Sequence, residues 1–330
     1  MSQQYSAVVV GLGRIGALYP SEKIPRTHVA AYMDNKNVRM IAGIDPDPET
    51  RLKFRELWGD GIKLFPSISE MLAAGFRPDI VSICTTPSIL QKNIRDFSNY
   101  KPKMYFLEKP AVSSERQSKE LLDAIGDTPV AMNYHRCWDP RHKLFFEKIN
   151  KSRIFSVRVL YSKGLLNYAS HMIALLVQNF GEVSSVSKCI KGQDCQGEKD
   201  HSYSFSLHFK QGFNAIFQGV NDINYDLLET DFITDLGIYS LKSGGCRQSH
   251  EKPVKGQFYP NYSLLADSLL DTGKGQVEGL SQAVENIVNF MNGKVERIEC
   301  DLKCGLNTFK IMNQVRNLHL NENTKKKEDK

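Results

Sequence analysis

The sequence has no apolar run long enough to cross a membrane and no concentration of charge of either sign. Its longest clean apolar run, Met172–Val177, is far below the roughly 20 residues that a membrane span needs. Lys and Arg number 43 against 37 Asp and Glu, and outside the tail Thr324–Lys330 the excess is spread thinly. The N-terminus, MSQQYS, lacks the basic and apolar regions of a signal peptide. We therefore expect no membrane segment, no nucleic-acid surface and no secretion signal.

Cysteine pairs and metal-ligand patterns are also missing. The seven cysteines form no Cys-x-x-Cys pair, and the closest two, Cys300 and Cys304, have no His or Cys cluster near them in the sequence. The eight histidines show no ligand spacing. We expect neither a disulfide framework nor a metal site, and a reducing cytoplasm is the expected location.

What the sequence does contain is a regular alternation over its first 135 residues. Short runs rich in Val and Ile alternate with segments that carry helix signals, such as Asp47 before Pro48 and the capping box Ser67-x-x-Glu70. The runs are Tyr5–Val10, Val38–Ile44, Asp79–Cys84, Met104–Leu107 and Val130–Asn133. This pattern predicts an α/β fold with a doubly wound parallel sheet.

After about residue 150 the strands become longer and alternate in polarity. They are Ile154–Tyr161, Val183–Ile190, Tyr203–Phe209, Phe213–Val220, Leu228–Thr234 and Ile238–Lys242. They predict a large, open, mostly antiparallel sheet, with a hairpin at Lys210–Gly212 and two closing helices, Gln276–Met291 and Leu302–Leu320. We expect one domain over 1–135, a second over 136–320, and a disordered charged tail over 321–330 that has nothing apolar to bury.

A glycine-rich loop, Gly11-Leu12-Gly13-Arg14-Ile15-Gly16, follows the first predicted strand and opens a helix. Gly11 permits a tight turn, Gly13 lets a pyrophosphate approach the backbone, and Gly16 allows close packing of the helix on the sheet. Asp45 ends the second strand, where a carboxylate can bind both ribose hydroxyls and repel a 2′-phosphate. The pattern favours NAD over NADP, whereas the alternative is that Asp45 only caps the turn before Pro46.

The spacing inside this motif is unusual. Asp45 lies 29 residues after Gly16, more than the usual ~20. The excess falls at Tyr19–Arg26, which holds two prolines and is unsuited to continue a helix. It is either a loop over the phosphates, with Lys23 or Arg26 nearby, or a plain surface insertion.

Further motifs follow in order along the chain, and together with this loop and Asp45 they resemble the glucose–fructose oxidoreductase/inositol dehydrogenase (Gfo/Idh/MocA) family. They are Cys84-Thr85-Thr86-Pro87, Glu108-Lys109-Pro110, Asn133–Pro140 (NYHRCWDP) and Gly164–His171 (GLLNYASH). The resemblance implies a Rossmann domain followed by an α/β domain that binds substrate and forms a homodimer or homotetramer through its sheet. It also implies hydride transfer between NAD(P) and a secondary alcohol or ketone of a sugar, cyclitol or nucleotide sugar.

The resemblance also implies roles for single residues. Lys109 would face the nicotinamide and substrate, with Glu108, Asn133 and the wall Thr85-Thr86-Pro87 beside the cofactor. An alcohol oxidation needs a base and a group that stabilises the alkoxide, which we assign to His171 and Lys109. A surface Lys109 paired with Glu108 and a buried structural His171 are the alternatives.

Substrate contacts are expected from Asn167, Tyr168, Arg136 and Trp138. Asn167, four residues before His171, is expected on the same helix face. Many family members carry Asp at the positions of Asn167 and Ala174, and Asn cannot act as a base. Arg136 could hold a hydroxyl, carboxylate or phosphate, whereas Trp138 either stacks on a ring or, as we favour, packs between domains.

Two other functions compete with the oxidoreductase. A dinucleotide-binding regulator or sensor would keep the fold without turnover, and the two missing acids favour it. An S-adenosylmethionine methyltransferase also uses a glycine loop and an acid after strand two. It would explain neither Glu108-Lys109-Pro110 nor a large antiparallel second domain.

Overall fold

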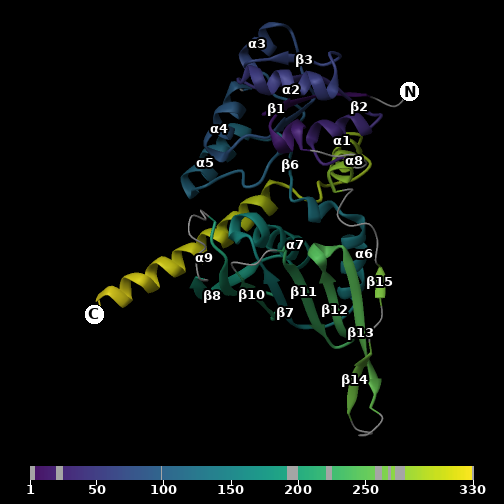
Figure 1. The fold of residues 1–330 in the computed structure, drawn as a ribbon, viewed down its shortest axis with the longest axis vertical. Coiled ribbons are helices and arrows are strands. Elements are labelled where there is room, and N and C mark those ends of the chain that lie inside the picture. Colours follow the sequence, from purple (N-terminus) through teal and green to yellow (C-terminus); the bar gives the residue numbers. More distant parts are fainter. Residues whose placement is uncertain are drawn as a thin grey trace. The chain divides into compact units, whose positions relative to one another are not determined.

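The chain divides into two compact units. The computed structural model describes residues 4–19, 25–97, 99–191, 200–220, 225–256, 262–266, 269–271 and 279–328. Unit 1 comprises residues 1–139 and 277–306, and unit 2 comprises residues 140–276 and 307–330 (Figure 1). The sequence suggested a single boundary near residue 135, whereas the chain returns to unit 1 after completing the second sheet.

Unit 1 is built on a six-stranded parallel sheet in the order β3-β2-β1-β4-β5-β6. Its strands are β1 (Tyr5–Val10), β2 (Val38–Ile44), β3 (Lys63–Phe65), β4 (Ile80–Ile83), β5 (Met104–Leu107) and β6 (Val130–Met132). Its helices are η1 (Arg14–Leu18), α1 (His28–Asp34), α2 (Pro48–Trp58), α3 (Ile68–Ala73), α4 (Pro87–Asp96), α5 (Glu115–Ile125), η2 (His135–Trp138) and α8 (Gly279–Met291). The order reverses between β1 and β4, which confirms the predicted doubly wound sheet.

Local signals start the helices of unit 1 where the sequence predicted. Asp47 accepts hydrogen bonds from the backbone N–H groups of Glu49 and Thr50, with Pro48 in the first turn of α2. Ser67 accepts from the N–H of Glu70, and its hydroxyl donates to the Glu70 carboxylate, so Ser67 caps α3 as predicted. The three-residue strand β3 was missed, because so short a run has no readable period.

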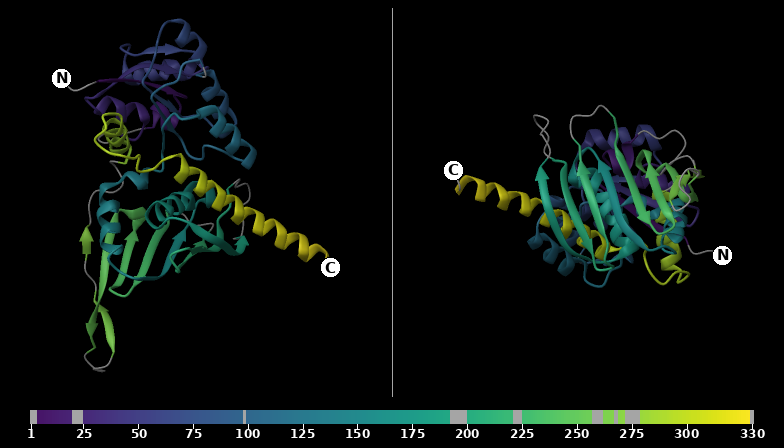
Figure 2. Two further views of the ribbon diagram at one scale, coloured as in Figure 1. Left: turned by 180° about the vertical axis from the view of Figure 1, so that it is seen from behind. Right: turned by 90° about the horizontal axis from the view of Figure 1, so that it is seen from below.

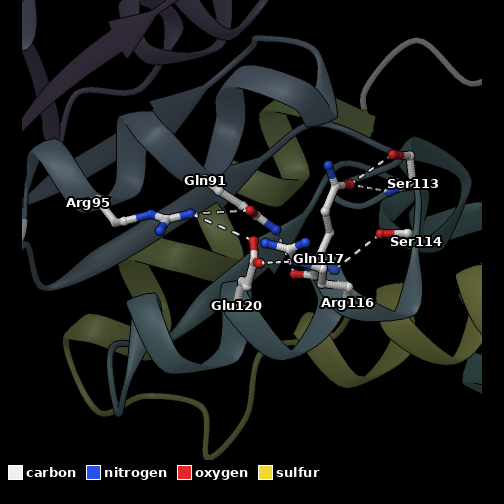
Figure 3. A network of polar contacts seen from close by, with 7 residues as sticks. All are labelled: Gln91, Arg95, Ser113, Ser114, Arg116, Gln117 and Glu120. Atoms are coloured by element: carbon white, nitrogen blue, oxygen red, sulfur yellow. Dashed lines mark hydrogen bonds and ion pairs between the residues drawn. The ribbon is translucent and has the colours of Figure 1, made fainter.

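A polar network joins α4 to α5 (Figure 3). Gln91 of α4 donates to the backbone oxygen of Gln117 on α5 at 2.6 Å. Glu120 accepts from Arg116 at 2.7 Å and pairs with Arg95 at 3.7 Å. These contacts link the two helices that follow β4 and β5.

The returning segment completes the core of unit 1. Its helix α8 lies against α1, where Asn35 donates to Glu285 and Ser281 donates to Asp34. The N–H of Met132 donates to the carbonyl of Cys300 at 2.8 Å, so the backbone beyond α8 runs beside β6. Segments far apart in the sequence therefore share one sheet edge.

Unit 2 contains a nine-stranded sheet in the order β14-β13-β12-β11-β7-β10-β9-β8, with β15 paired to β13. Its strands are β7 (Ile154–Tyr161), β8 (Val183–Lys191), β9 (Tyr203–Phe209), β10 (Asn214–Gly219), β11 (Leu228–Thr234), β12 (Gly237–Lys242), β13 (Arg247–Lys255), β14 (Ser263–Ala266) and β15 (Leu269–Asp271). The β7–β10 pair is parallel and the other pairs are antiparallel, which confirms the predicted mostly antiparallel sheet. The predicted hairpin at Lys210–Gly212 joins β9 to β10.

Helices cover one face of this sheet. They are α6 (Pro140–Ile149) and α7 (Ser170–Phe180), and the unit also holds η3 (Gly164–Ala169) and η4 (Ser243–Gly245). Phe146 of α6 packs edge-on against Phe232 with ring centroids 5.4 Å apart, and Phe180 of α7 packs against Phe213 at 5.3 Å. An aromatic layer therefore forms the core of unit 2.

The opposite face of the sheet is open (Figure 2, right). Along β9 the buried residues alternate strictly, so Phe205 and Leu207 point to the core while Ser204 and Ser206 point outward. Asp231 of β11 binds Arg158 and Lys242 on the neighbouring strands. Burial raises the pKa of Asp231, but its hydrogen bonds to Ser240, Arg158 and Lys242 bring it below the usual value. Ile216 of β10 and Ile233 of β11 are 49% and 39% exposed, so the open face combines polar side chains with single apolar ones.

The last helix, α9 (Leu302–Glu328), is longer than predicted. It continues through residues from Asn321 that we expected to be disordered, and Asp329 and Lys330 lie outside the described residues. Extending an existing helix through Lys and Glu adds hydrogen bonds without a new nucleation cost. None of the described helices combines the length and apolar character needed to cross a membrane.

Candidate functional site

The glycine-rich loop leaves β1 and passes close to the end of β4. Gly11 has φ +88°, and a Cβ there would lie 3.0 Å from the carbonyl oxygen of Cys84. A Cβ on Gly16 would lie 2.0 Å from the carbonyl oxygen of Gly11. By contrast, a Cβ on Gly13 would meet no atom within 4 Å. Two glycines are therefore required by the loop itself, while Gly13 presents an open backbone that a phosphate can approach.

The helix after the loop is short and ends before the insertion, at Leu18. Leu18 N–H donates to Gly13 and Tyr19 N–H to Arg14, so η1 is a single π-helical turn in which Ile15 is half-buried and Arg14 lies over the Tyr19 ring. The next helix, α1, begins only at His28, capped by Thr27. Residues 20–24 of the insertion lie outside the described residues, so neither interpretation of the insertion is tested.

Asp45 is fixed against the loop. Its Oδ2 accepts from the N–H of Leu12 at 2.9 Å, and its Oδ1 accepts from the N–H of Asp47 at 3.0 Å. Arg51 donates to the carbonyl oxygens of Asp45 and Pro46. A carboxylate accepts up to about four hydrogen bonds, so Asp45 retains capacity for ribose hydroxyls beside the turn that it caps.

The other expected cofactor residues meet at the same edge of the sheet. Because parallel strands end together, Thr85, Glu108 and Asn133 follow the carboxyl ends of β4, β5 and β6 beside the glycine loop. Thr85 accepts from Asn93 at 3.1 Å, and Thr86 precedes α4, in which Pro87 is the first residue. Ligands bind at this edge in doubly wound sheets.

Glu108 is the centre of a buried hydrogen-bond cluster. Its Oε1 accepts from Asn133 Nδ2 at 2.5 Å and contacts His28 Nε2 at 2.9 Å, and its Oε2 accepts from the N–H of Lys109 at 3.3 Å. Asn133 is 4% exposed, and its Oδ1 has no hydrogen-bond partner among the described residues. A buried acceptor without a donor fits a bound ligand that supplies one, as the amide of a nicotinamide does. The sequence did not single out His28, because a long insertion separates it from Gly16.

In unit 2, Asp200 holds the segment that carries Asn167. Its carboxylate accepts from the N–H groups of Leu166 at 2.9 Å and Asn167 at 2.8 Å. A Cβ on Gly164 would lie 2.3 Å from this carboxylate, so the contact requires glycine. Asp200 was not predicted, since it stands 33 residues from Asn167 in a polar stretch without a motif.

The predicted catalytic helix begins differently from our expectation. Asn167 lies in η3, which is π-helical, and α7 starts at Ser170, so Asn167 and His171 do not have regular α-helical spacing. Asn167 is exposed, whereas His171 is 4% exposed. Tyr168 lies beneath Lys163, whose Nζ is 5.6 Å from its ring centre. Lys109 belongs to unit 1 and His171 to unit 2, so their joint action is a proposal.

Arg136 and Trp138 lie in the short helix η2 of unit 1. Arg136 is 7% exposed, and Trp138 is 3% exposed with its indole N–H donated to the carbonyl of Met132 at 3.1 Å. The burial of the indole favours a packing role for Trp138 over stacking on a ligand.

The structure brings Cys137 into contact with Cys300 and Cys304, a cluster that the sequence did not reveal. All three thiols are buried, and burial raises the pKa values of Cys137 and Cys300. Among the described residues, no group of three or more His, Cys, Asp or Glu side chains is arranged to hold a metal ion.

These features define an NAD-binding Rossmann unit followed by a unit with a large mixed sheet. Residues 5–134 match the model of the oxidoreductase family with an NAD-binding Rossmann fold, Gfo/Idh/MocA. This is the family that the ordered motifs resemble. Comparison with curated protein sequences finds no match.

Solved structures share the fold of both units at low sequence identity. An oxidoreductase from Agrobacterium radiobacter, crystallised with NAD+, L-tartaric acid and magnesium, has a TM-score of 0.75 and 14% identity over 94% of this chain and 95% of its own. The WlbA dehydrogenase from Bordetella pertussis, crystallised with NADH and UDP-GlcNAcA, has a TM-score of 0.74 and 16% identity over 96% of each chain. The transcriptional regulator Gal80p from Kluyveromyces lactis has a TM-score of 0.75 and 13% identity over 97% of this chain and 91% of its own. One fold therefore serves enzymes and a regulator.

The glycine loop yields a test with an internal control. Gly13→Ala should keep the melting temperature of the natural protein and weaken NAD binding at least about tenfold, because only the ligand approaches this position. Gly16→Ala should destabilise the fold, since its Cβ meets a backbone oxygen. Gly61→Ala, whose Cβ also meets nothing within 4 Å, should change neither property. Calorimetry that finds unchanged NAD affinity in Gly13→Ala would show that the phosphates bind elsewhere.

Proposed function

We propose that this protein is an NAD-dependent oxidoreductase that transfers a hydride between the nicotinamide and a secondary alcohol or ketone of a sugar, cyclitol or nucleotide sugar. The observation that carries the proposal is the sheet edge of unit 1. There the open backbone at Gly13 and the fixed carboxylate of Asp45 share an edge with the Glu108–Asn133 cluster and its buried free acceptor. Pyrophosphate, ribose and nicotinamide amide each have a matching group.

The remaining steps of the reaction are assigned to individual residues of this chain. Bound NAD supplies the hydride acceptor. Lys109 contributes a positive charge that stabilises the developing alkoxide, and His171 accepts the hydroxyl proton. Asn167 and Tyr168 provide hydrogen bonds to substrate hydroxyls, with Asp200 fixing the backbone of Asn167. Arg136 is assigned to a polar substrate group, and Trp138 to packing.

A regulator or sensor without turnover is the second candidate. Asn167 stands where many enzymes of the family have an acid, and Gal80p shows that the fold also occurs in a transcriptional regulator. A screen for NADH formation over sugars, cyclitols and nucleotide sugars separates the two candidates. Turnover of any of these compounds supports the enzyme, whereas tight sugar or NAD binding without turnover supports the sensor.

The charge of Asp45 should set the choice of cofactor. Asp45→Asn keeps an acceptor for the N–H of Leu12 but removes the charge that repels a 2′-phosphate, so the ratio of NADP to NAD affinity should rise about tenfold or more. Asp47→Asn, which removes a neighbouring charge at a helix cap, should leave the ratio nearly unchanged. If calorimetry finds that the natural protein prefers NADP, the assignment of Asp45 is wrong.

The two catalytic assignments predict different defects. His171→Ala should lower turnover by roughly 10²–10⁴ with NAD affinity nearly unchanged, because it removes only the base. Lys109→Ala should impair turnover and substrate binding together. His250→Ala, which removes another buried histidine of unit 2, serves as the control for folding. If His171→Ala keeps full activity on the substrate, Lys109 or water accepts the hydroxyl proton, and the assignment of His171 as the base is wrong.

Assembly of copies of the chain through the sheet of unit 2 is part of the proposal. The open face presents serines and the Arg158–Asp231–Lys242 group, which suits a hydrogen-bonded contact between copies. We expect a dimer or tetramer by light scattering. A mass near that of one 37.4 kDa chain at every dilution would refute it.

A further inference from the structure

Behind Glu108 lies a line of polar side chains that the proposed chemistry does not use. Tyr32 Oη is 2.6 Å from Ser82 Oγ, Ser82 Oγ is 2.8 Å from His28 Nδ1, and His28 Nε2 is 2.9 Å from Glu108 Oε1. Tyr32 and His28 are one helical turn apart on α1, and Ser82 is in the middle of β4. His28 and Ser82 are 0% exposed and Tyr32 is 1% exposed. Polar side chains buried this deeply each need a hydrogen-bond partner.

The donors in this line can be assigned from the chemistry of its two ends. An ionised Glu108 only accepts hydrogen bonds, so His28 Nε2 must carry a hydrogen. At the other end, burial raises the pKa of Tyr32, so its hydroxyl keeps its proton. Tyr32 makes no other hydrogen bond within the described residues, so this proton goes to Ser82. Ser82 then donates to His28 Nδ1, which is the bare nitrogen of a neutral imidazole.

A charged His28 fits this environment worse. Its Nδ1 would carry a hydrogen and donate to Ser82. If Ser82 then donates to Tyr32, the phenol proton has no acceptor in the described part of the chain, and if Tyr32 donates to Ser82, the serine proton has none. Either arrangement costs about 1–3 kcal/mol for a buried group. The neutral form satisfies all four side chains.

Glu108 is ionised in this cluster. Burial alone raises the pKa of Glu108, but the hydrogen bond and electrostatic attraction of His28, the hydrogen bond from Asn133 and the charge of Lys109 bring it below the usual value. Cys84 and Tyr134 also interact electrostatically with Glu108, and burial raises the pKa of each, so both are neutral.

We propose that Tyr32, Ser82 and neutral His28 form a one-directional hydrogen-bond chain that holds Glu108 ionised and in place, so that Glu108 positions Lys109 and Asn133 for the cofactor. The three are positioning residues, and their role rests on the proposed function. The chain orients the Asn133 amide with its Oδ1 away from Glu108, because only Nδ2 can donate to a carboxylate.

The test begins with a measurement that needs neither cofactor nor substrate. In protein labelled with nitrogen-15 at histidine, His28 at neutral pH should show an imidazole with a hydrogen on Nε2 and none on Nδ1. Its signals are assigned by their loss in His28→Gln, or by their shift in Ser82→Ala if His28→Gln does not fold. A hydrogen on Nδ1, which a charged imidazole also carries, would overturn the proposal.

The second measurement tests positioning. Ser82→Ala and Tyr32→Phe break the chain without touching the site, and NAD affinity should fall about tenfold in Ser82→Ala and less in Tyr32→Phe. His28→Gln, which can still donate to Glu108, should retain more affinity than His28→Ala. His250→Gln in unit 2 is the matched control and should bind NAD as the natural protein does. Unchanged NAD affinity in both Ser82→Ala and His28→Ala, with the fold intact, would overturn the proposal.

A pH series completes the design. Because the pKa of Glu108 is lowered in the folded protein, its ionisation stabilises the fold above the usual glutamate pKa of about 4.3, and this contribution is lost as the pH falls through the folded value. The difference in unfolding free energy between the natural protein and Glu108→Gln should therefore be constant at neutral pH and shrink below about pH 4.3. A difference that does not change with pH would contradict an ionised Glu108. If NAD does not bind at all, the proposed function fails, while the imidazole signals still decide the state of His28.

Discussion

The carboxylate of Glu108 links the elements on which the site of unit 1 depends. It joins α1 through His28, the end of β5 through the N–H of Lys109, and the end of β6 through Asn133. A carboxylate withdrawn from water needs such partners, because an unpaired buried charge is far more costly than a hydrogen-bonded one. The hydrogen bonds that stabilise the Glu108 carboxylate away from water also orient His28 and Asn133 beside it.

Two short helices, η1 and α1, lie between β1 and β2, and the second of them supplies His28 to Glu108. In place of one helix after the glycine loop, the chain makes the single turn η1 and begins α1 anew at Thr27 and His28. This restart directs the imidazole of His28 into the sheet, where its ring lies 4.4 Å from that of Phe106. The two helices therefore have different roles. The helix η1 packs against Gly11 of the glycine loop, whereas α1 carries His28 and Tyr32 of the hydrogen-bond chain.

In unit 2 the sheet serves as a platform with two different faces. The aromatic layer under α6 and α7 stabilises it, and the ion-paired face with Asp231 remains polar. Asp200, just before β9, holds the backbone of η3, so the position of Asn167 depends on a contact between segments 33 residues apart. A carboxylate is thus retained beside Asn167, though it binds backbone N–H groups rather than replacing the missing acid.

The sequence by itself determined the doubly wound sheet, most strand positions, the caps at Asp47 and Ser67, and the cofactor loop with Asp45. Each depends on local rules, because strand periodicity, helix capping and glycine conformation are properties of a few adjacent residues. The tertiary structure alone decided which residues from distant segments share a site. The contacts of His28 with Glu108, of Asp200 with Asn167 and of Cys137 with Cys300 all depend on packing between segments far apart in the chain. No local pattern encodes such a contact, since a buried partner is selected by three-dimensional proximity and by the need to satisfy polar groups removed from water.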